Sequence, residues 1–95
     1  MKKVMKKLID EFNVDPKIKK IFKPYYENHP GFAVFTETHM LGIKVLMETG
    51  PCRIEKIIPI YELEEAYNLK NKTIKNSIYH TLECMLIDLF GEWRY

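Results

Sequence analysis

Apolar residues recur every three to four positions through the first part of the chain, which is the spacing of one face of an α-helix. Residues 2–13 have lysines on the opposite face, and the apolar set is Val4, Met5, Leu8, Ile9 and Phe12. Asp15 is a suitable N-cap for a second helix, and Pro16 fits its first position, where a missing N–H costs nothing. We expect Pro24 to end this helix, because the residue before a proline avoids the helical region. Its inward residues are Ile18, Ile21 and Phe22.

The pattern changes from helical to extended after residues 25–30, which are expected to form a loop. Residues 32–38 and 43–49 are rich in Phe, Val, Ile and Thr, which favour strands. A tight connection at residues 39–42 makes these two segments a β-hairpin. Gly50 and Pro51 interrupt the second strand, and residues 52–58 provide a short third strand before Pro59. The pattern therefore predicts three antiparallel strands.

Residues 60–82 have the outline of two amphipathic helices joined by a tight turn. The first is expected from Ile60 to Tyr67, with Leu63 on the same face. Asn68 follows where such a turn needs a residue that tolerates the left-handed conformation. Leu69 is then expected as the buried turn residue, and Asn71 as the N-cap of the second helix. The segment predicts a helix-turn-helix.

The second helix of this segment has two chemically different faces at about 100° per residue. Its apolar stripe is Ile74, Ile78, Leu82, Met85 and Leu89, and its polar side is Lys72, Lys75, Asn76, Tyr79 and Glu83. Lysine binds phosphates, Asn can bond two edges of adenine, and Tyr can contact phosphate or base. We therefore expect a DNA-contacting set in this helix and the turn before it. The set is Lys70, Asn71, Lys72, Thr73, Lys75, Asn76 and Tyr79.

The segment resembles the helix-turn-helix of bacterial and archaeal regulators. Within that class, the run from Leu63 through Glu83 is similar, without a gap, to the DNA-binding domain of the sporulation response regulator, where an Asn also follows an aromatic residue at the turn. The resemblance covers about a quarter of the chain and implies binding of double-stranded DNA. Helical hairpins with the same pattern also occur in proteins that touch no nucleic acid.

Together the elements predict one α+β domain over residues 1–95, with the order ααβββαα. Its parts are a basic helical hairpin at 1–24, a β-meander at 31–58 and a helix-turn-helix with a long last helix at 60–90. In winged-helix proteins the hairpin usually follows the recognition helix, whereas here it precedes it. The sheet is therefore either the wing of a variant with the sheet placed earlier, or a separate platform for a partner or a second copy.

The last helix is expected to run to about Phe90, with Gly91 as its stop. Ile87 and Phe90 fall on its otherwise polar side, and Trp93 and Tyr95 follow. These residues either pack on the amino-terminal helices or form the seam of a homodimer. Regulators that bind two half-sites need such a seam, and we expect a homodimer.

Charge is distributed unevenly along the chain. The formal net charge is only +2, which is low for a stand-alone nucleic-acid binder. Residues 1–24, however, carry eight lysines and three acids. This segment is either a further source of phosphate contacts or a solvated helix face. The absence of a long apolar run or a secretory signal indicates a cytoplasmic protein with no membrane partner.

Catalytic and metal-binding patterns are missing from the sequence. Cys52 and Cys84 form no CxxC and are expected as free thiols, and the three histidines share no ligand spacing with them. A phosphate-binding Gly loop, GxSxG and HExxH are all absent. We therefore expect no enzymatic activity, no metal and no cofactor. The alternative to a DNA-binding regulator is a small protein-binding module or inhibitor, of the kind found in phages and mobile elements, which would use a hairpin edge or the acidic run at residues 62–65.

Overall fold

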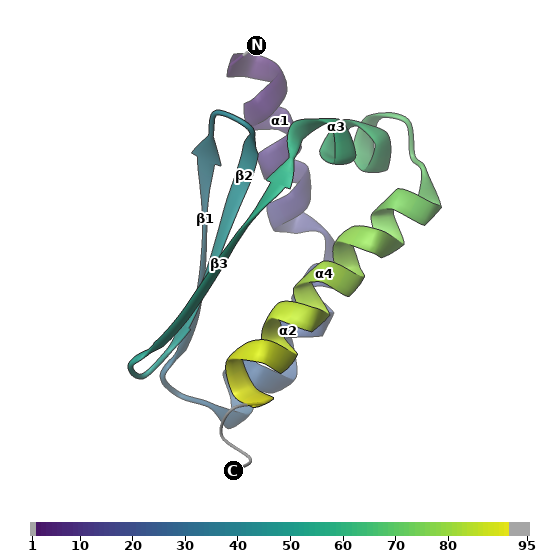
Figure 1. Cartoon of the computed structure of the whole chain (residues 1–95). Helices are drawn as coiled ribbons and strands as arrows, with labels where there is room; N and C mark the ends of the chain where they lie inside the picture. The colour runs from purple at the N-terminus through teal and green to yellow at the C-terminus, as the bar shows by residue number, and fades with distance from the viewer. Residues whose placement is uncertain (1, 92–95) are drawn as a thin grey trace.

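The computed structural model describes residues 2–91 of the chain, with side chains from residue 6 onward. Two helices, a three-stranded sheet and a carboxy-terminal helical segment follow one another (Figure 1). This confirms the predicted α+β class, with helices at both ends and a long last helix. The elements are α1 (Lys2–Val14), α2 (Pro16–Asn28), β1 (Phe32–His39), β2 (Gly42–Thr49), β3 (Cys52–Pro59), α3 (Ile60–Leu63), the π-helical turn η1 (Glu64–Asn68) and α4 (Lys72–Gly91).

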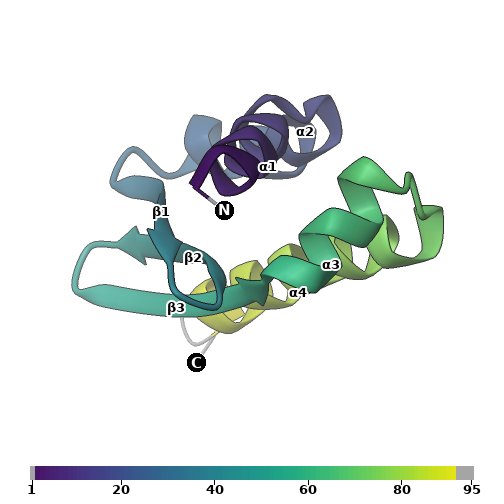
Figure 2. The ribbon, with the colours of Figure 1, turned by 90° about the horizontal axis from the view of Figure 1, so that it is seen from above.

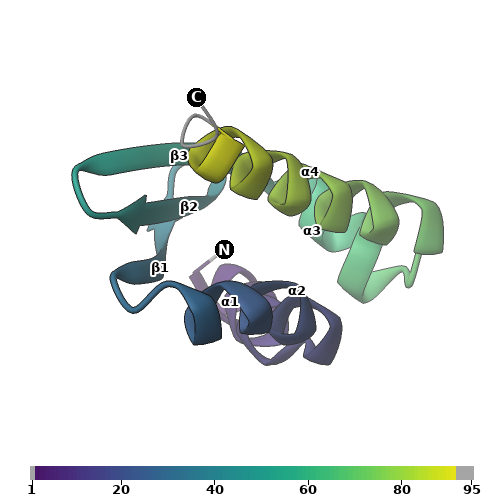
Figure 3. The same ribbon diagram turned by 90° about the horizontal axis from the view of Figure 1, so that it is seen from below.

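The sheet is an antiparallel meander of order β1-β2-β3, with two-residue turns at 40–41 and 50–51. Alternation along β2 separates its two faces, because Ile43, Val45 and Met47 are fully buried while the residues between them are half-buried. The helices lie on the face that these three residues occupy (Figures 2 and 3). Phe35 points to the opposite face and is 51% exposed. One face of the sheet is therefore left uncovered by helices.

The core lies between this sheet and the helices. α1 and α2 pack on β1, while α4 packs on β2 and β3. The predicted inward residues Leu8, Phe12, Ile18 and Phe22 are buried, which confirms the two amino-terminal amphipathic faces. Val4 and Met5, predicted on the same face, lie outside the described side chains. Of the apolar stripe predicted in α4, Ile78, Leu82, Met85 and Leu89 are buried and Ile74 is half-buried.

The prediction that α2 ends at Pro24 is wrong, and residues 25–28 are helical rather than a loop. Pro24 is exposed, so the carbonyl of Lys20 loses its helical N–H partner on the solvent side, where it is accessible to water. Continuing the helix brings Tyr25 to 5.0 Å from the Phe90 ring and Tyr26 to 5.0 Å from the Phe32 ring. These aromatic contacts outweigh the local cost of the proline.

The end of α4 is covered by the carboxy-terminal end of α2. The Phe90 ring lies 4.5 Å from that of His29, in addition to its contact with Tyr25, so of the two alternatives Phe90 packs within the chain. Ile87 is 64% exposed and remains on the polar side. Trp93 and Tyr95 lie outside the described residues.

A close backbone approach joins the sheet to the last helical segment. A Cβ at Gly42 would lie 1.9 Å from the carbonyl oxygen of Ile58 and 2.9 Å from the backbone nitrogen of Ile60. That nitrogen donates to the carbonyl of Leu41 at 2.9 Å. Only glycine therefore allows the start of α3 to cross the first residue of β2 at this distance.

Candidate nucleic-acid interface

α3 and η1 form one helical segment at the predicted place, but its second half is wound as a π-helix. The N–H of Leu69 donates to the carbonyl of Glu64, five residues back, at 3.0 Å. The wider turn keeps Asn68 inside the helix, so the prediction of a left-handed Asn68 is wrong. Lys70 takes the left-handed conformation instead, with φ of 52°. The predicted burial of Leu69 is also wrong, since this side chain is 70% exposed.

Asn71 holds the start of α4, as predicted. Its Oδ1 accepts from the backbone N–H groups of Thr73 at 3.0 Å and Ile74 at 3.2 Å. Its Nδ2 donates to Glu65 Oε2 at 3.1 Å, and its backbone N–H donates to the Glu65 carbonyl at 2.9 Å. The first turn of α4 is thus tied to η1 by side chain and backbone, which fixes the angle at which α4 leaves the turn.

The predicted DNA-contacting residues differ in exposure. Lys70, Lys72, Thr73 and Asn76 are exposed, whereas Asn71 and Lys75 are half-buried. Lys72 and Asn76 are one turn apart and therefore share an outward face of α4. Asn71 is already engaged by capping and by Glu65. The structure brings the exposed members together at the start of α4.

The placement of Tyr79 on the polar face of α4 is wrong. Tyr79 is 6% exposed, and its hydroxyl donates to Asp15 Oδ2 at 2.6 Å. The apolar stripe of α4 predicts only the side that packs on the sheet. α2 covers a second side of α4 (Figure 1). Tyr79 lies under this second cover, so its hydroxyl is directed inward.

Asp15 lies at the centre of a buried polar network that joins the start of α2 to η1 and α4. It is 5% exposed and accepts from the Lys17 N–H at 2.9 Å, from the Tyr67 hydroxyl at 2.9 Å and from Tyr79. Burial raises its pKa, but the bonds from Tyr79, Tyr67 and Lys17 and the charge of Lys75 outweigh this, so the pKa of Asp15 lies below its ordinary value. Burial and the bond to Asp15 raise the pKa of both tyrosines. The carboxylate therefore stays ionised and the phenols stay neutral.

Two lysines flank this network. Lys17 Nζ lies 5.0 Å from the centroid of the Tyr79 ring, and Lys75 Nζ lies 5.1 Å from that of Tyr67. Lys17 and Lys20 also line a shallow groove between α2 and α4 whose far side includes Glu83. Lys17 thus lies beside the first half of α4, and Lys20 lies beside its second half.

Sequence reasoning assigned Asp15 only a capping role, Tyr67 only an apolar one and Lys17 none. A buried tyrosine hydroxyl needs a hydrogen-bond partner. Both tyrosines border apolar stripes, and Asp15 precedes a helix that was expected to bury its own stripe. Tyrosines beside apolar stripes, together with an Asp before a buried helix, are the sequence signal for such a network. One sequence does not show which carboxylate accepts from which hydroxyl.

Other potential ligand groups are sparse. Cys52 and Cys84 are free, half-buried thiols, as expected. The prediction that no histidine is spaced to meet a cysteine is wrong for one pair. His80 and Cys84 are one turn apart on α4, and His80 Nε2 lies 3.4 Å from Cys84 Sγ. Among the described residues, three or more His, Cys, Asp or Glu side chains do not gather as metal ligands. Within residues 2–91, no helix has both the length and the apolar character to cross a membrane.

The comparisons with known proteins give no relatives: a scan against protein-family models and searches of curated proteins and of solved structures found no match.

Proposed function

We propose that this chain is a small regulator that binds double-stranded DNA through the first half of α4. The observation that carries the proposal is that Lys17 and Lys75 flank the same buried network, Lys17 over the Tyr79 ring and Lys75 over the Tyr67 ring. One lysine of the basic amino-terminal segment therefore lies beside the helix that was expected to contact DNA. If the amino-terminal lysines and those of α4 lay on opposite sides of the molecule, DNA binding would be disfavoured. A basic surface that both segments share is what nucleic-acid binding requires.

Phosphate contacts are assigned to lysines from the two helices and from the turn between η1 and α4. They are Lys17, Lys70, Lys72 and Lys75. Asn76, exposed and one turn beyond Lys72, is placed to bond a base edge, and Thr73 adds a hydroxyl beside it. Tyr79 positions α4 through Asp15 and leaves the contact set. Glu83 and Asp88 mark the end of the basic surface along α4.

The test is a titration of duplex DNA at several salt concentrations. We expect Lys72→Ala to weaken binding and to reduce the slope of log K against log salt by about 0.9, the value for one phosphate contact. Asn76→Ala should reduce discrimination between duplex sequences by about 1–3 kcal/mol and leave the salt slope unchanged. Lys56→Ala is the matched control, because Lys56 is an exposed lysine on β3. Wild-type protein that binds no duplex even at low salt would exclude the proposal.

The proposal includes a homodimer, since regulators commonly bind two half-sites. Ile87, 64% exposed on the second half of α4, offers an apolar position beyond the basic surface. We expect Ile87→Glu to weaken self-association and to keep the circular dichroism spectrum of the wild type. Sedimentation of the wild-type protein as a monomer at high micromolar concentration would exclude the dimer and leave DNA binding to be judged separately.

A second candidate function is a protein-binding module. The observation that favours it is exposed apolar surface away from α4: Met40 is 96% exposed, Leu41 63% and Phe35 51%. The first two form the β1–β2 turn, and the third is on the uncovered face of the sheet. A pull-down with one stoichiometric partner that is lost with Phe35→Ser and kept with Lys72→Ala would favour this function over DNA binding.

A further inference from the structure

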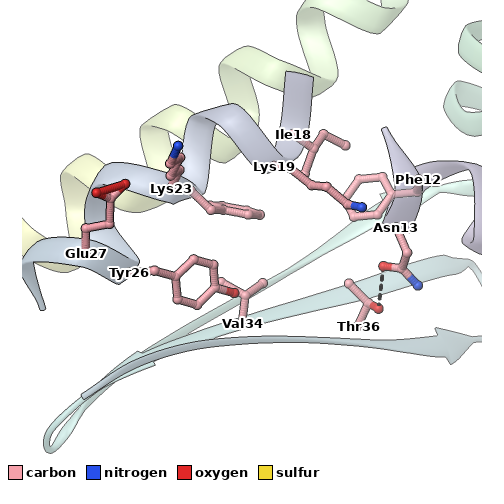
Figure 4. Close-up of a pocket in the computed structure, with 10 residues that line it drawn as sticks. Phe12, Asn13, Ile18, Lys19, Lys23, Tyr26, Glu27, Val34 and Thr36 are labelled. Atoms are coloured by element: carbon pink, nitrogen blue, oxygen red, sulfur yellow. Dashed lines mark hydrogen bonds between the residues drawn. The ribbon is translucent and has the colours of Figure 1, made fainter. Parts of the chain in front are cut away.

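A groove of about 520 Å³ runs between the amino-terminal helices and β1 (Figure 4). Small-molecule sites in proteins have volumes of about 300–1,000 Å³, so this groove is large enough for a small organic ligand. Its apolar walls are Phe12, Ile18, Phe22, Tyr26 and Val34. It lies apart from the basic surface assigned to DNA, because it opens along the β1 side of α2 rather than the α4 side.

The polar groups of the groove are arranged asymmetrically. Lys19, Lys23 and Glu27 follow one another at one-turn intervals along α2, so the positive charges come first and the single carboxylate lies at the far end. In Figure 4 the Lys19 side chain extends toward Asn13, whereas Lys23 and Glu27 lie toward the opposite end, near Tyr26. The end beside Asn13 therefore has one lysine and no carboxylate, and the other end has charges of both signs.

Asn13 and Thr36 close the groove at the Lys19 end. The Thr36 hydroxyl donates to Asn13 Oδ1 at 3.0 Å, which links α1 to β1 there. The Lys19 ammonium at this end of an apolar groove matches the charge of a single carboxylate. A phosphate head group, with its greater charge and third oxygen, would call for more donors than this end provides.

The edge of β1 is already occupied where the groove meets it. In Figure 4 the Tyr26 ring lies against Val34, so this side chain obstructs a peptide that would add to β1 as a further strand at this position. The groove is open to side-on entry of a small molecule over the Tyr26 and Phe22 rings. Geometry therefore disfavours an extended peptide and favours a compact ligand.

We propose that this groove binds a small carboxylate with an apolar tail. The carboxylate pairs with the Lys19 ammonium, and the tail runs over Phe22 toward Tyr26. This binding site is independent of DNA binding, since no residue is shared between the two surfaces. Its occupation is expected to leave the uncovered face of the sheet unchanged.

The test is a titration of the full chain with octanoate, followed by two-dimensional amide NMR. We expect shifts concentrated at Asn13, Lys19 and Val34, and saturable binding. Octanol has the same tail without the charge, and it should bind more weakly, by up to about fivefold, the upper value for a solvent-exposed ion pair. Lys19→Met should lower octanoate affinity by a similar factor, and Lys56→Met, an exposed lysine outside the groove, should not.

A second variant tests the tail. Val34→Phe places a larger side chain in the groove and should abolish octanoate shifts at Lys19 while the thermal unfolding midpoint reports whether the variant folds. Three results would overturn the assignment: no saturable shifts with octanoate, equal affinity for octanol and octanoate, or equal octanoate affinity of wild type and Lys19→Met. Shifts of the same amides on dilution of the protein alone would instead assign the groove to a second copy of the chain.

Discussion

Tyr79→Phe isolates one hydrogen bond of the Asp15 network. The substitution removes a single oxygen atom, keeps the ring that Lys17 covers and leaves no new polar group. Asp15, only 5% exposed, loses the shortest of its three bonds, the 2.6 Å bond from Tyr79, and keeps those from Tyr67 and the Lys17 N–H. The carboxylate cannot regain the lost bond from water without opening the contact between α2 and α4.

The expected cost follows from the charge of the acceptor. A hydrogen bond to an ionised group contributes about 1.5–3 kcal/mol to stability. When the donor is removed and the charged acceptor stays buried, the protein loses the whole of this contribution. We expect Tyr79→Phe to lower the free energy of unfolding by about 2 kcal/mol. For a chain of this size, 1 kcal/mol corresponds to about 4–8 °C, so the midpoint should fall by about 8–16 °C. Urea unfolding followed by far-UV circular dichroism measures the first quantity, and a thermal scan measures the second.

The pH dependence gives an independent check. The pKa of folded Asp15 lies below its ordinary value of 3.8, so its stabilisation is present above pH 3.8 and is lost as pH falls from there through the folded-state pKa. The pKa of folded Tyr79 lies above its ordinary value of 10.0, so the tyrosine stabilises below pH 10 and this contribution is lost as pH rises beyond it. In Tyr79→Phe both losses should be smaller than in wild type. A variant within about 0.5 kcal/mol of wild type at pH 7, with an unchanged pH profile, would refute the network's stabilising role.

Two further substitutions test the backbone of the fold by urea unfolding. Gly42→Ala should destabilise by about 3 kcal/mol or more, because its Cβ would overlap the Ile58 carbonyl at 1.9 Å and neither backbone segment can yield alone; a near-neutral Gly42→Ala would contradict the close crossing. Pro24→Ala should stabilise by about 1–2 kcal/mol, because alanine restores the bond to the Lys20 carbonyl in a helix that already continues to Asn28, and the gain is reduced by the greater freedom of the unfolded chain. A destabilised Pro24→Ala would show that the proline ring contributes packing.

Local chemistry was sufficient for most of the secondary structure. The strands alternate between buried and exposed positions and are separated by residues that favour turns, so their limits fall within one residue of prediction. Asp15 and Asn71 both cap helices because a short oxygen-bearing side chain before a helix bonds the first free N–H groups whatever surrounds it. Such features depend on neighbours in the sequence, which is why the sequence alone identifies them.

Failures occurred where a distant residue decides. Pro24 stays helical because Tyr25 reaches Phe90, a contact across most of the chain. Tyr79 is buried because Asp15, 64 residues away, accepts its hydrogen bond. The left-handed residue moved from Asn68 to Lys70 because the π-helical turn keeps Asn68 helical. Periodicity describes one helix face at a time and does not reveal a second packing partner.

Lys75 and Lys72 differ in what their variants can reveal about DNA binding. Lys75 Nζ lies 5.1 Å from the Tyr67 ring and lowers the pKa of Asp15 by its charge, so Lys75→Ala would change the network that holds α4 as well as any phosphate contact. Lys72 is exposed one turn earlier and takes no part in that network. A loss of affinity with Lys75→Ala alone would therefore indicate a displaced helix. A loss with Lys72→Ala, at unchanged stability and with a reduced salt slope, reports contact with phosphate directly.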